Sequence, residues 1–205
     1  MRERVSGGLF IGDIKLIHVA IKNMEKFARF FLLLCLYFFP TSQVEASEIK
    51  QRSQELIAKQ FGIETTITFR KLDLAPDLRK RIEAMAGQRF FRNSIYAWKI
   101  SGGDTTVGYA ILDNVIGKSL PITFLVIFDS DGIILSTHVV KYREAIGGEI
   151  SNRRWNRQFL GRNYQSSFSA GNDIDGISGA TISVNAMTRG IHKLTILMEI
   201  IREDL

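Results

Sequence analysis

The sequence predicts an α+β fold, in which an antiparallel sheet of about four to five strands packs with flanking helices and a long helix ends the chain. Two observations predict it. Four β-rich segments follow one another between short turns rich in glycine, asparagine and aspartate, which is typical of an antiparallel meander. Apolar residues then recur at helical spacing up to Ile201. The four β-rich segments cover residues 94–101, 105–112, 121–128 and 133–142.

Two helices and one further strand are expected before this meander. Residues 47–61 have apolar side chains at helical spacing, and Ser47 is the expected N-cap of that helix. Residues 65–72 are rich in β-branched side chains and predict a fifth strand. Pro76 opens a second helix that extends to Gln88, because proline is tolerated in the first turn.

The turns and the remaining elements complete the prediction. Glycine pairs and Asn/Asp-containing stretches place turns at residues 102–103, 114–117 and 129–132. The segment 120–128 is apolar on both faces, which indicates a central strand covered on both sides. Residues 151–160 predict a short helix, and residues 182–203 predict the long C-terminal one.

Composition places the chain among globular proteins and argues against several functions. It has 205 residues, of which 45% are hydrophobic, enough for one domain to bury a core. The 27 Lys and Arg exceed the 21 Asp and Glu only slightly, and no basic element with interleaved aromatic residues indicates a nucleic-acid partner. The one cysteine cannot form an internal disulfide, and the three histidines have no metal-ligand spacing.

The N-terminal 46 residues are expected to be an upstream extension followed by a signal peptide. Residues 30–39 form an uncharged apolar run after basic residues, and a small-x-small tail ends at Ala46. The signal proper covers about residues 24–46, so residues 1–23 precede it. A membrane anchor is the alternative, although spanning needs roughly 20 apolar residues. The sequence therefore predicts an exported or periplasmic single domain, residues 47–205, which is membrane-associated if the apolar segment is retained.

The most informative stretch is DGISGAT, residues 175–181, which leads directly into the last helix. Small and hydroxyl residues before a helix can be ordinary cap chemistry, with Thr181 or Ser183 accepting amide hydrogen bonds. The combination of acid, serine, glycine, alanine and threonine at fixed spacing is nevertheless rare by chance in a chain of this length. It therefore indicates a functional motif.

With these residues the sequence resembles the FMN-binding domain family, which includes covalently flavinylated subunits of the sodium-translocating NADH:quinone reductase and of the Rnf complex. Residues 175–181 match every defined position of the family signature D-x-x-[ST]-G-A-[TS]. The resemblance implies FMN as cofactor, held on Thr181 through a phosphoester bond. It covers about residues 108–192, and this chain resembles a stand-alone exported member.

A second segment supports the resemblance. Residues 142–149, YREAIGGE, are similar to the family segment near the isoalloxazine ring, although Ala145 and Ile146 replace its Thr-Pro pair. An aromatic helix end follows, formed by Trp155, Gln158, Phe159 and Gly161.

The candidate site residues have distinct expected roles. Gly179 and Ala180 leave room for a phosphate beside Ser178 and Thr181. Asp175 is expected, from the family, to be recognised by the flavin transferase that uses FAD and Mg²⁺, and the alternative is an Asx-turn. On the ring side the candidates are Glu144, which could equally be a solvated strand-end carboxylate, and Gly147 and Gly148, which could equally form a plain turn.

The sequence favours a redox carrier over an enzyme with its own substrate. No His, Cys or Lys stands beside Glu144 in the chain, and no glycine fingerprint for NADH is present. The expected partners are the flavin transferase and a membrane or periplasmic redox partner. The alternative is a binding or structural module of the same fold that has no cofactor or holds flavin noncovalently.

Overall fold

The computed structural model describes residues 22–31 and 41–205. The chain divides into two compact units, residues 1–48 and 49–205, and the second contains the whole sheet. Residues 22–31 are helical. Most of the apolar run predicted at residues 30–39 lies outside the described residues. Within the described ranges, every helix is too short or too polar to span a bilayer.

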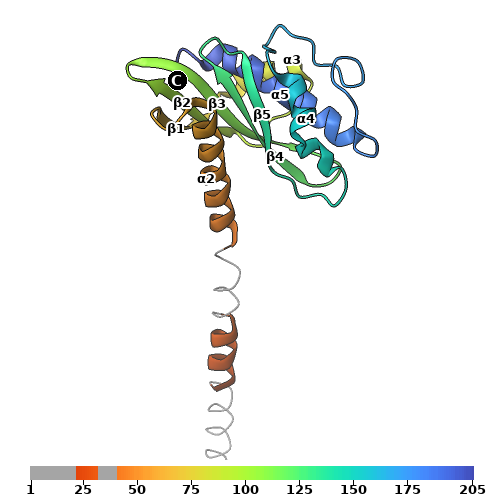
Figure 1. Cartoon of the computed structure of the whole chain (residues 1–205). Helices are drawn as coiled ribbons and strands as arrows, with labels where there is room; N and C mark the ends of the chain where they lie inside the picture. Colours follow the sequence, from red (N-terminus) through yellow and green to blue (C-terminus); the bar gives the residue numbers. More distant parts are fainter. Residues whose placement is uncertain (1–21, 32–40) are drawn as a thin grey trace, which may run out of the picture. The chain divides into compact units, whose positions relative to one another are not determined.

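Five strands form one antiparallel meander in the order β1-β2-β3-β4-β5 (Figure 1). This confirms the α+β prediction, with five strands at the upper end of the expected number. The strands are β1 (Thr66–Asp73), β2 (Ser94–Gly102), β3 (Thr105–Ile116), β4 (Pro121–Asp129) and β5 (Ile134–Lys141).

Two details of the sheet differ from expectation. The turn expected at residues 114–117 starts later, because β3 continues to Ile116 and pairs there with Pro121. The Asn114 side chain accepts a hydrogen bond from Thr123 Oγ1 across the strands, at 2.6 Å, so this asparagine stabilises pairing instead of a turn. β4 is buried on both faces as predicted, but β3, not β4, is the central strand.

The helix boundaries also correct the prediction. Helix α2 (Thr41–Phe61) begins six residues before Ser47, so Ser47 is not its N-cap. Good helix formers fill the positions just before Ser47, so nothing there ends the helix. Helix α3 (Pro76–Ala86) has proline in its first turn as expected. It ends before Gln88 because Gly87 adopts a left-handed conformation, with φ of 62°.

The short helix expected over residues 151–160 is three short segments. They are the 3₁₀ helix η1 (Gly148–Ser151), α4 (Arg153–Asn156) and the 3₁₀ helix η2 (Arg157–Phe159). Asn152 separates the first two, and its side chain accepts a hydrogen bond from the Arg154 amide at 2.8 Å. This cap fixes the start of α4.

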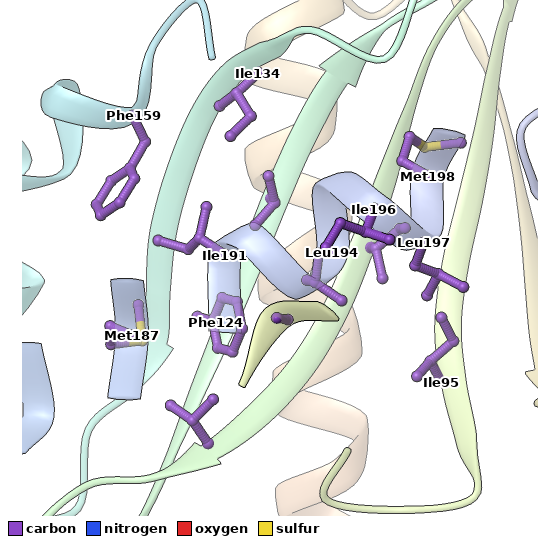
Figure 2. Packing of buried hydrophobic residues seen from close by; sticks show 14 of the residues in the cluster. Ile95, Phe124, Ile134, Phe159, Met187, Ile191, Leu194, Ile196, Leu197 and Met198 are labelled. Atoms are coloured by element: carbon purple, nitrogen blue, oxygen red, sulfur yellow. The ribbon is translucent and has the colours of Figure 1, made fainter. Parts of the chain in front are cut away.

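The core has two layers, one on each face of the sheet. Residues of α2 from Ile49 onward cover one face, and α3 and α5 (Thr181–Ile201) cover the other. Figure 2 shows Met187, Ile191 and Leu194 of α5 close to Phe124 of β4. This second layer positions the start of α5, where the sequence motif ends.

One charged pair lies inside the second layer. Lys193 of α5 is fully buried, and its Nζ lies 2.7 Å from Asp113 Oδ2 of β3. The same Nζ donates a hydrogen bond to the Arg89 carbonyl at 2.9 Å and lies 4.2 Å from the centre of the Phe90 ring. Burial raises the pKa of Asp113, and the nearby Lys193 charge opposes that rise.

Candidate functional site

Two segments that are far apart in the sequence meet at the start of α5. The first is the loop after β5, and the second is the segment that ends at Ala180, just before α5. In the loop, Gly147 has a left-handed conformation with φ of 86°. A Cβ at Gly147 would lie 2.8 Å from Tyr142 Oη and 2.9 Å from Ala180 Cβ. The hydroxyl of Tyr142 also donates a hydrogen bond to the Ile146 carbonyl. The loop is therefore packed directly against the residue that precedes Thr181.

Glu144 connects three elements at this place. Its Oε1 accepts hydrogen bonds from the backbone amides of Ser119, at 2.7 Å, and Leu120, at 3.0 Å. Its Oε2 lies 3.5 Å from Tyr142 Oη and 3.4 Å from Ser183 Oγ, close to the outer limit for hydrogen bonds. Hydrogen bonding, chiefly from the Ser119 amide, lowers the pKa of Glu144. The ionised carboxylate thus joins the β3–β4 turn to the first turn of α5.

The contacts of Glu144 differ from those of a carboxylate at a strand end in solvent. A carboxylate that merely ends a strand in solvent would have water as its partner, whereas Glu144 has protein donors from both sides. The β3–β4 turn approaches closely here, because a Cβ at Gly117 would lie 2.9 Å from Glu144 Oε1 and 3.0 Å from Ser183 Oγ. The sequence does not reveal the contribution of this turn, because its donors are backbone amides and carry no side-chain signal.

The first turn of α5 has no side-chain cap. Ala180 is the N-cap residue, and Thr181 is the first residue of the helix. Ser183 Oγ faces Glu144, so the expectation that Thr181 or Ser183 caps the helix is wrong. The amide of Val184 makes the first backbone hydrogen bond of the helix, which it donates to the Ala180 carbonyl at 2.9 Å. The preceding amides leave positive partial charge at this helix end.

The aromatic segment fixes Asp175 by its backbone. Trp155 Nε1 donates a hydrogen bond to the Asp175 carbonyl at 2.8 Å, and Gln158 Oε1 accepts one from the Asp175 amide at 2.7 Å. Trp155 and Phe159 are buried and contact each other edge to face at 5.2 Å, so both are core residues, as the sequence favoured. Within the described residues the Asp175 carboxylate makes no hydrogen bond, so the Asx-turn alternative is wrong.

The other predicted site residues fall into two groups. Ser178, Gly179 and Thr181 are exposed at the start of α5, and Gly179 adopts a left-handed conformation with φ of 77°. Gly148 opens η1, and a Cβ there would meet no atom within 4 Å, so close approach does not require this glycine. Of the two glycines, only Gly147 is required by the packing around the site.

The two histidines in the folded unit lie apart from this arrangement. His192 stacks on Phe168, with ring centres 4.7 Å apart, and His138 lies on β5 near Ser136. Burial lowers the pKa of both imidazoles. Within residues 22–31 and 41–205, neither forms a hydrogen bond with the segments around Thr181.

The residues present fit a flavin phosphate. An exposed threonine hydroxyl stands at a helix end whose first amides have no side-chain acceptor, and the residues before it, Gly179 and Ala180, are small. Helix N-termini of this kind favour a negative group.

Residues 117–195 match the family model of the FMN-binding domain. This segment is therefore similar to the FMN-binding domain family. The match confirms the resemblance seen in the motif and supports FMN as the ligand.

A solved structure shares the fold. The crystal structure of Shewanella oneidensis NqrC is similar with a TM-score of 0.50 and 13% identity, and the likeness covers 72% of this chain and 91% of that one. At this identity the likeness establishes the fold alone. Among curated proteins, no relative matches the chain.

Proposed function

We propose that this domain carries FMN covalently on Thr181 and acts as an electron carrier. The observation that supports it best is the start of α5, where an exposed threonine in a matched family motif lies at an uncapped helix end. Ordinary cap chemistry would have explained the hydroxyl residues without any cofactor, and the structure has no such cap. The similarity to NqrC is consistent with the proposal at the level of the fold.

The proposed attachment is a phosphoryl transfer to Thr181. The Thr181 oxygen bonds to the FMN phosphorus, the pyrophosphate bond of FAD breaks, AMP leaves and the hydroxyl proton is released. A flavin transferase with Mg²⁺ would catalyse the step and recognise Asp175. The product diester retains one negative charge, which the helix end stabilises by about 0.3–1 kcal/mol at an exposed site. Gly179 and Ala180 leave the hydroxyl open to the transferase.

The site supports a carrier more than an enzyme. Bound flavin supplies one- and two-electron redox chemistry. An enzyme would need a proton donor or base beside it. Hydrogen bonds lower the pKa of Glu144, the carboxyl at the junction, so near neutral pH it is ionised, is not a proton donor and is only a weak base. Its hydrogen bonds to two backbone amides give it a positioning role instead.

We also propose that the protein is exported and that its mature form begins near Ser47. The apolar run and the small-x-small tail of the sequence support this. Cleavage after Ala46 would keep Ile49 and all later residues of α2 that pack on the sheet. The boundary between the two units, at Glu48 and Ile49, falls two residues after the proposed cleavage. The intact mass of protein from the periplasm tests this proposal, and retention of residues 30–39 would indicate an anchor.

Attachment is tested by co-expressing the protein with a flavin transferase and measuring flavin absorbance after denaturation and precipitation. Wild type and Thr181→Ser are expected to keep the colour, whereas Thr181→Val is expected to lose it. Thr105→Val is the matched control, because it removes an exposed threonine hydroxyl on β3, outside the motif. Colour that survives denaturation in Thr181→Val would place the bond elsewhere, and colour only in the native state would favour noncovalent flavin.

A further inference from the structure

We propose that the surface around α4 and the start of α5 docks an acidic protein partner. We call Arg153, Arg154 and Arg157 the arginine face, and Ile146 and Ile182 the apolar centre. The idea that electrons pass across this surface rests on the proposed function. The docking itself does not require flavin, so the two can be tested separately.

The arginine face presents three unneutralised charges. All three residues are exposed, and none forms an ion pair with a carboxylate in the part of the chain that the structure describes. They lie on α4 and at the start of η2, where the Asn152 cap holds the backbone. Each guanidinium group can bind a carboxylate through two parallel hydrogen bonds, and the fixed backbone limits the positions of the three groups.

The arginine face lies on the same short helical segments that hold one end of the proposed flavin site. Trp155 and Gln158 alternate with the arginines along the same turns, and both hold the backbone of Asp175. A partner bound to the arginines would therefore contact the segment that holds Asp175, six residues before Thr181. This position matters, because a carrier must bring its partner close to the redox group.

The positive charge continues along the edge of the sheet. Desolvation lowers the pKa of His138 on β5, and the positive charges of Arg153, Lys59 and Arg52 lower it further. The two residues from α2 are exposed. Arg153 therefore belongs to a wider region of positive potential, which would speed encounter with an acidic partner.

The apolar centre lies at the contact between the two site segments. Ile146 is 74% exposed and Ile182 is 56% exposed, although both are large aliphatic side chains. Ile146 precedes Gly147, which packs against Ala180, so the isoleucines flank the same contact. Ile116 and Leu120, 47% and 43% exposed, lie at the ends of the β3–β4 turn that Glu144 holds. An apolar centre with charged residues around it is typical of protein interfaces.

The mixture of charges favours a protein over an anionic bilayer. Glu149 and Asp175 are exposed beside the arginines, and a uniformly negative membrane would repel them. A protein can place its own positive residue opposite each of these carboxylates. The pattern therefore fits a partner with a mainly acidic surface and complementary individual charges.

The chain offers a matched control for net charge. Lys80, Arg81 and Arg92 are exposed on α3 and on the loop after it, and they form no ion pair among the described residues. The triple variant R153E/R154E/R157E and the control K80E/R81E/R92E change the net charge equally. A neutral triple, R153Q/R154Q/R157Q, tests the arginines without introducing new repulsion. Circular dichroism verifies the fold of each.

The experiment measures binding of the colourless full chain to a labelled flavodoxin, a small acidic redox protein, by fluorescence anisotropy at low salt. We expect the arginine-to-glutamate variant to bind at least about tenfold more weakly and the control at most about threefold. The glutamine variant should lie between wild type and the glutamate variant, and added salt should weaken wild type.

Equal losses in the glutamate variant and the control would overturn the proposal, since only net charge would then matter. Absence of wild-type binding at low salt would also overturn it. In a parallel arm, stronger arginine-dependent binding to phosphatidylglycerol vesicles than to flavodoxin would replace the protein partner with a membrane. If binding follows the arginines while Thr181 carries no flavin, the docking surface stands and the proposed carrier function fails.

Discussion

The backbone of Gly147 lies directly against Ala180, so closely that a Cβ at Gly147 would fall 2.9 Å from the Cβ of Ala180. This contact joins the loop after β5 to the residue before Thr181. Gly147 has a φ of 86°, which is a backbone conformation that residues with a Cβ rarely adopt. The geometry of the attachment site thus depends on a glycine more than 30 residues away in the sequence.

Gly147→Ala is expected to destabilise the protein by about 2 kcal/mol or more, from left-handed strain and the clash with Ala180. It should also slow flavin attachment to Thr181, because Ala180 must shift. Gly148→Ala is the control, since a Cβ there meets no atom within 4 Å. Urea unfolding and flavin incorporation measure the two effects. Equal behaviour of both variants would show that the contact is unimportant.

The buried pair of Lys193 and Asp113 gives a second prediction. Lys193→Met should cost about 3–5 kcal/mol at neutral pH, because it leaves a buried carboxylate without its partner. Burial already raises the pKa of Asp113, and loss of the lysine would raise it further. A raised folded pKa means that stability is greatest when the carboxyl is protonated and is lost as pH rises. The Lys193→Met variant should therefore become more stable as pH falls from neutral toward the ordinary aspartate pKa of about 3.9.

The double variant Lys193→Met/Asp113→Leu separates this effect from packing. It removes both charges and should recover most of the stability, without the gain at lower pH. Urea unfolding at several pH values measures this. A double variant as unstable as Lys193→Met would assign the loss to packing around Phe90 and Arg89 instead of to the charge.

Glu144 predicts a pH dependence of the opposite sign. Its folded pKa is lowered by hydrogen bonds, so its contribution is complete above the ordinary glutamate pKa of about 4.3 and is lost as pH falls through the lowered folded value. Glu144→Gln should therefore be less stable than wild type near neutral pH, and the difference should shrink toward about pH 3. Urea midpoints of both proteins across this range test it. A constant difference would mean that the carboxylate charge contributes nothing.

Features encoded by adjacent residues could be predicted from the sequence. The strands are visible in the sequence as β-rich segments between turn residues. Residues 175–181 are recognisable as a motif because its defining residues lie within seven consecutive positions. Gly87 and Ser47 show the limit of such reasoning. Gly87 ends α3 two residues before the predicted end at Gln88, and a serine at a plausible cap position lies inside α2, because the residues before it are equally helical.

Contacts between distant segments could not be predicted. Glu144 is held by the amides of Ser119 and Leu120, which any residue except proline could supply. Lys193 resembles a solvent-facing residue in the sequence, and its partner Asp113 is on β3, eighty positions earlier. Both arrangements depend on how α5 packs on the sheet. Sequence periodicity indicates that packing face but not the opposing side chain.

The hydrogen bond from Trp155 to Asp175 gives the last prediction. Trp155→Phe keeps an aromatic ring against Phe159 but removes the Nε1 donor, so the Asp175 carbonyl loses a partner. A neutral hydrogen bond contributes about 0.5–1.5 kcal/mol, which corresponds to roughly tenfold faster local opening at most. Amides of residues 175–181 should exchange faster with solvent by up to about this factor. Flavin attachment to Thr181 should also be slower.

Trp98→Phe is the matched control for this prediction. Trp98 is fully buried, and its Nε1 has no hydrogen-bond partner, so the substitution removes ring volume but no hydrogen bond. It lies in the layer covered by α2, on the other face of the sheet from α5. Its effect on exchange should be spread over the fold and not concentrated at residues 175–181. Unchanged exchange at those residues in Trp155→Phe would show that Gln158 alone holds Asp175 in place.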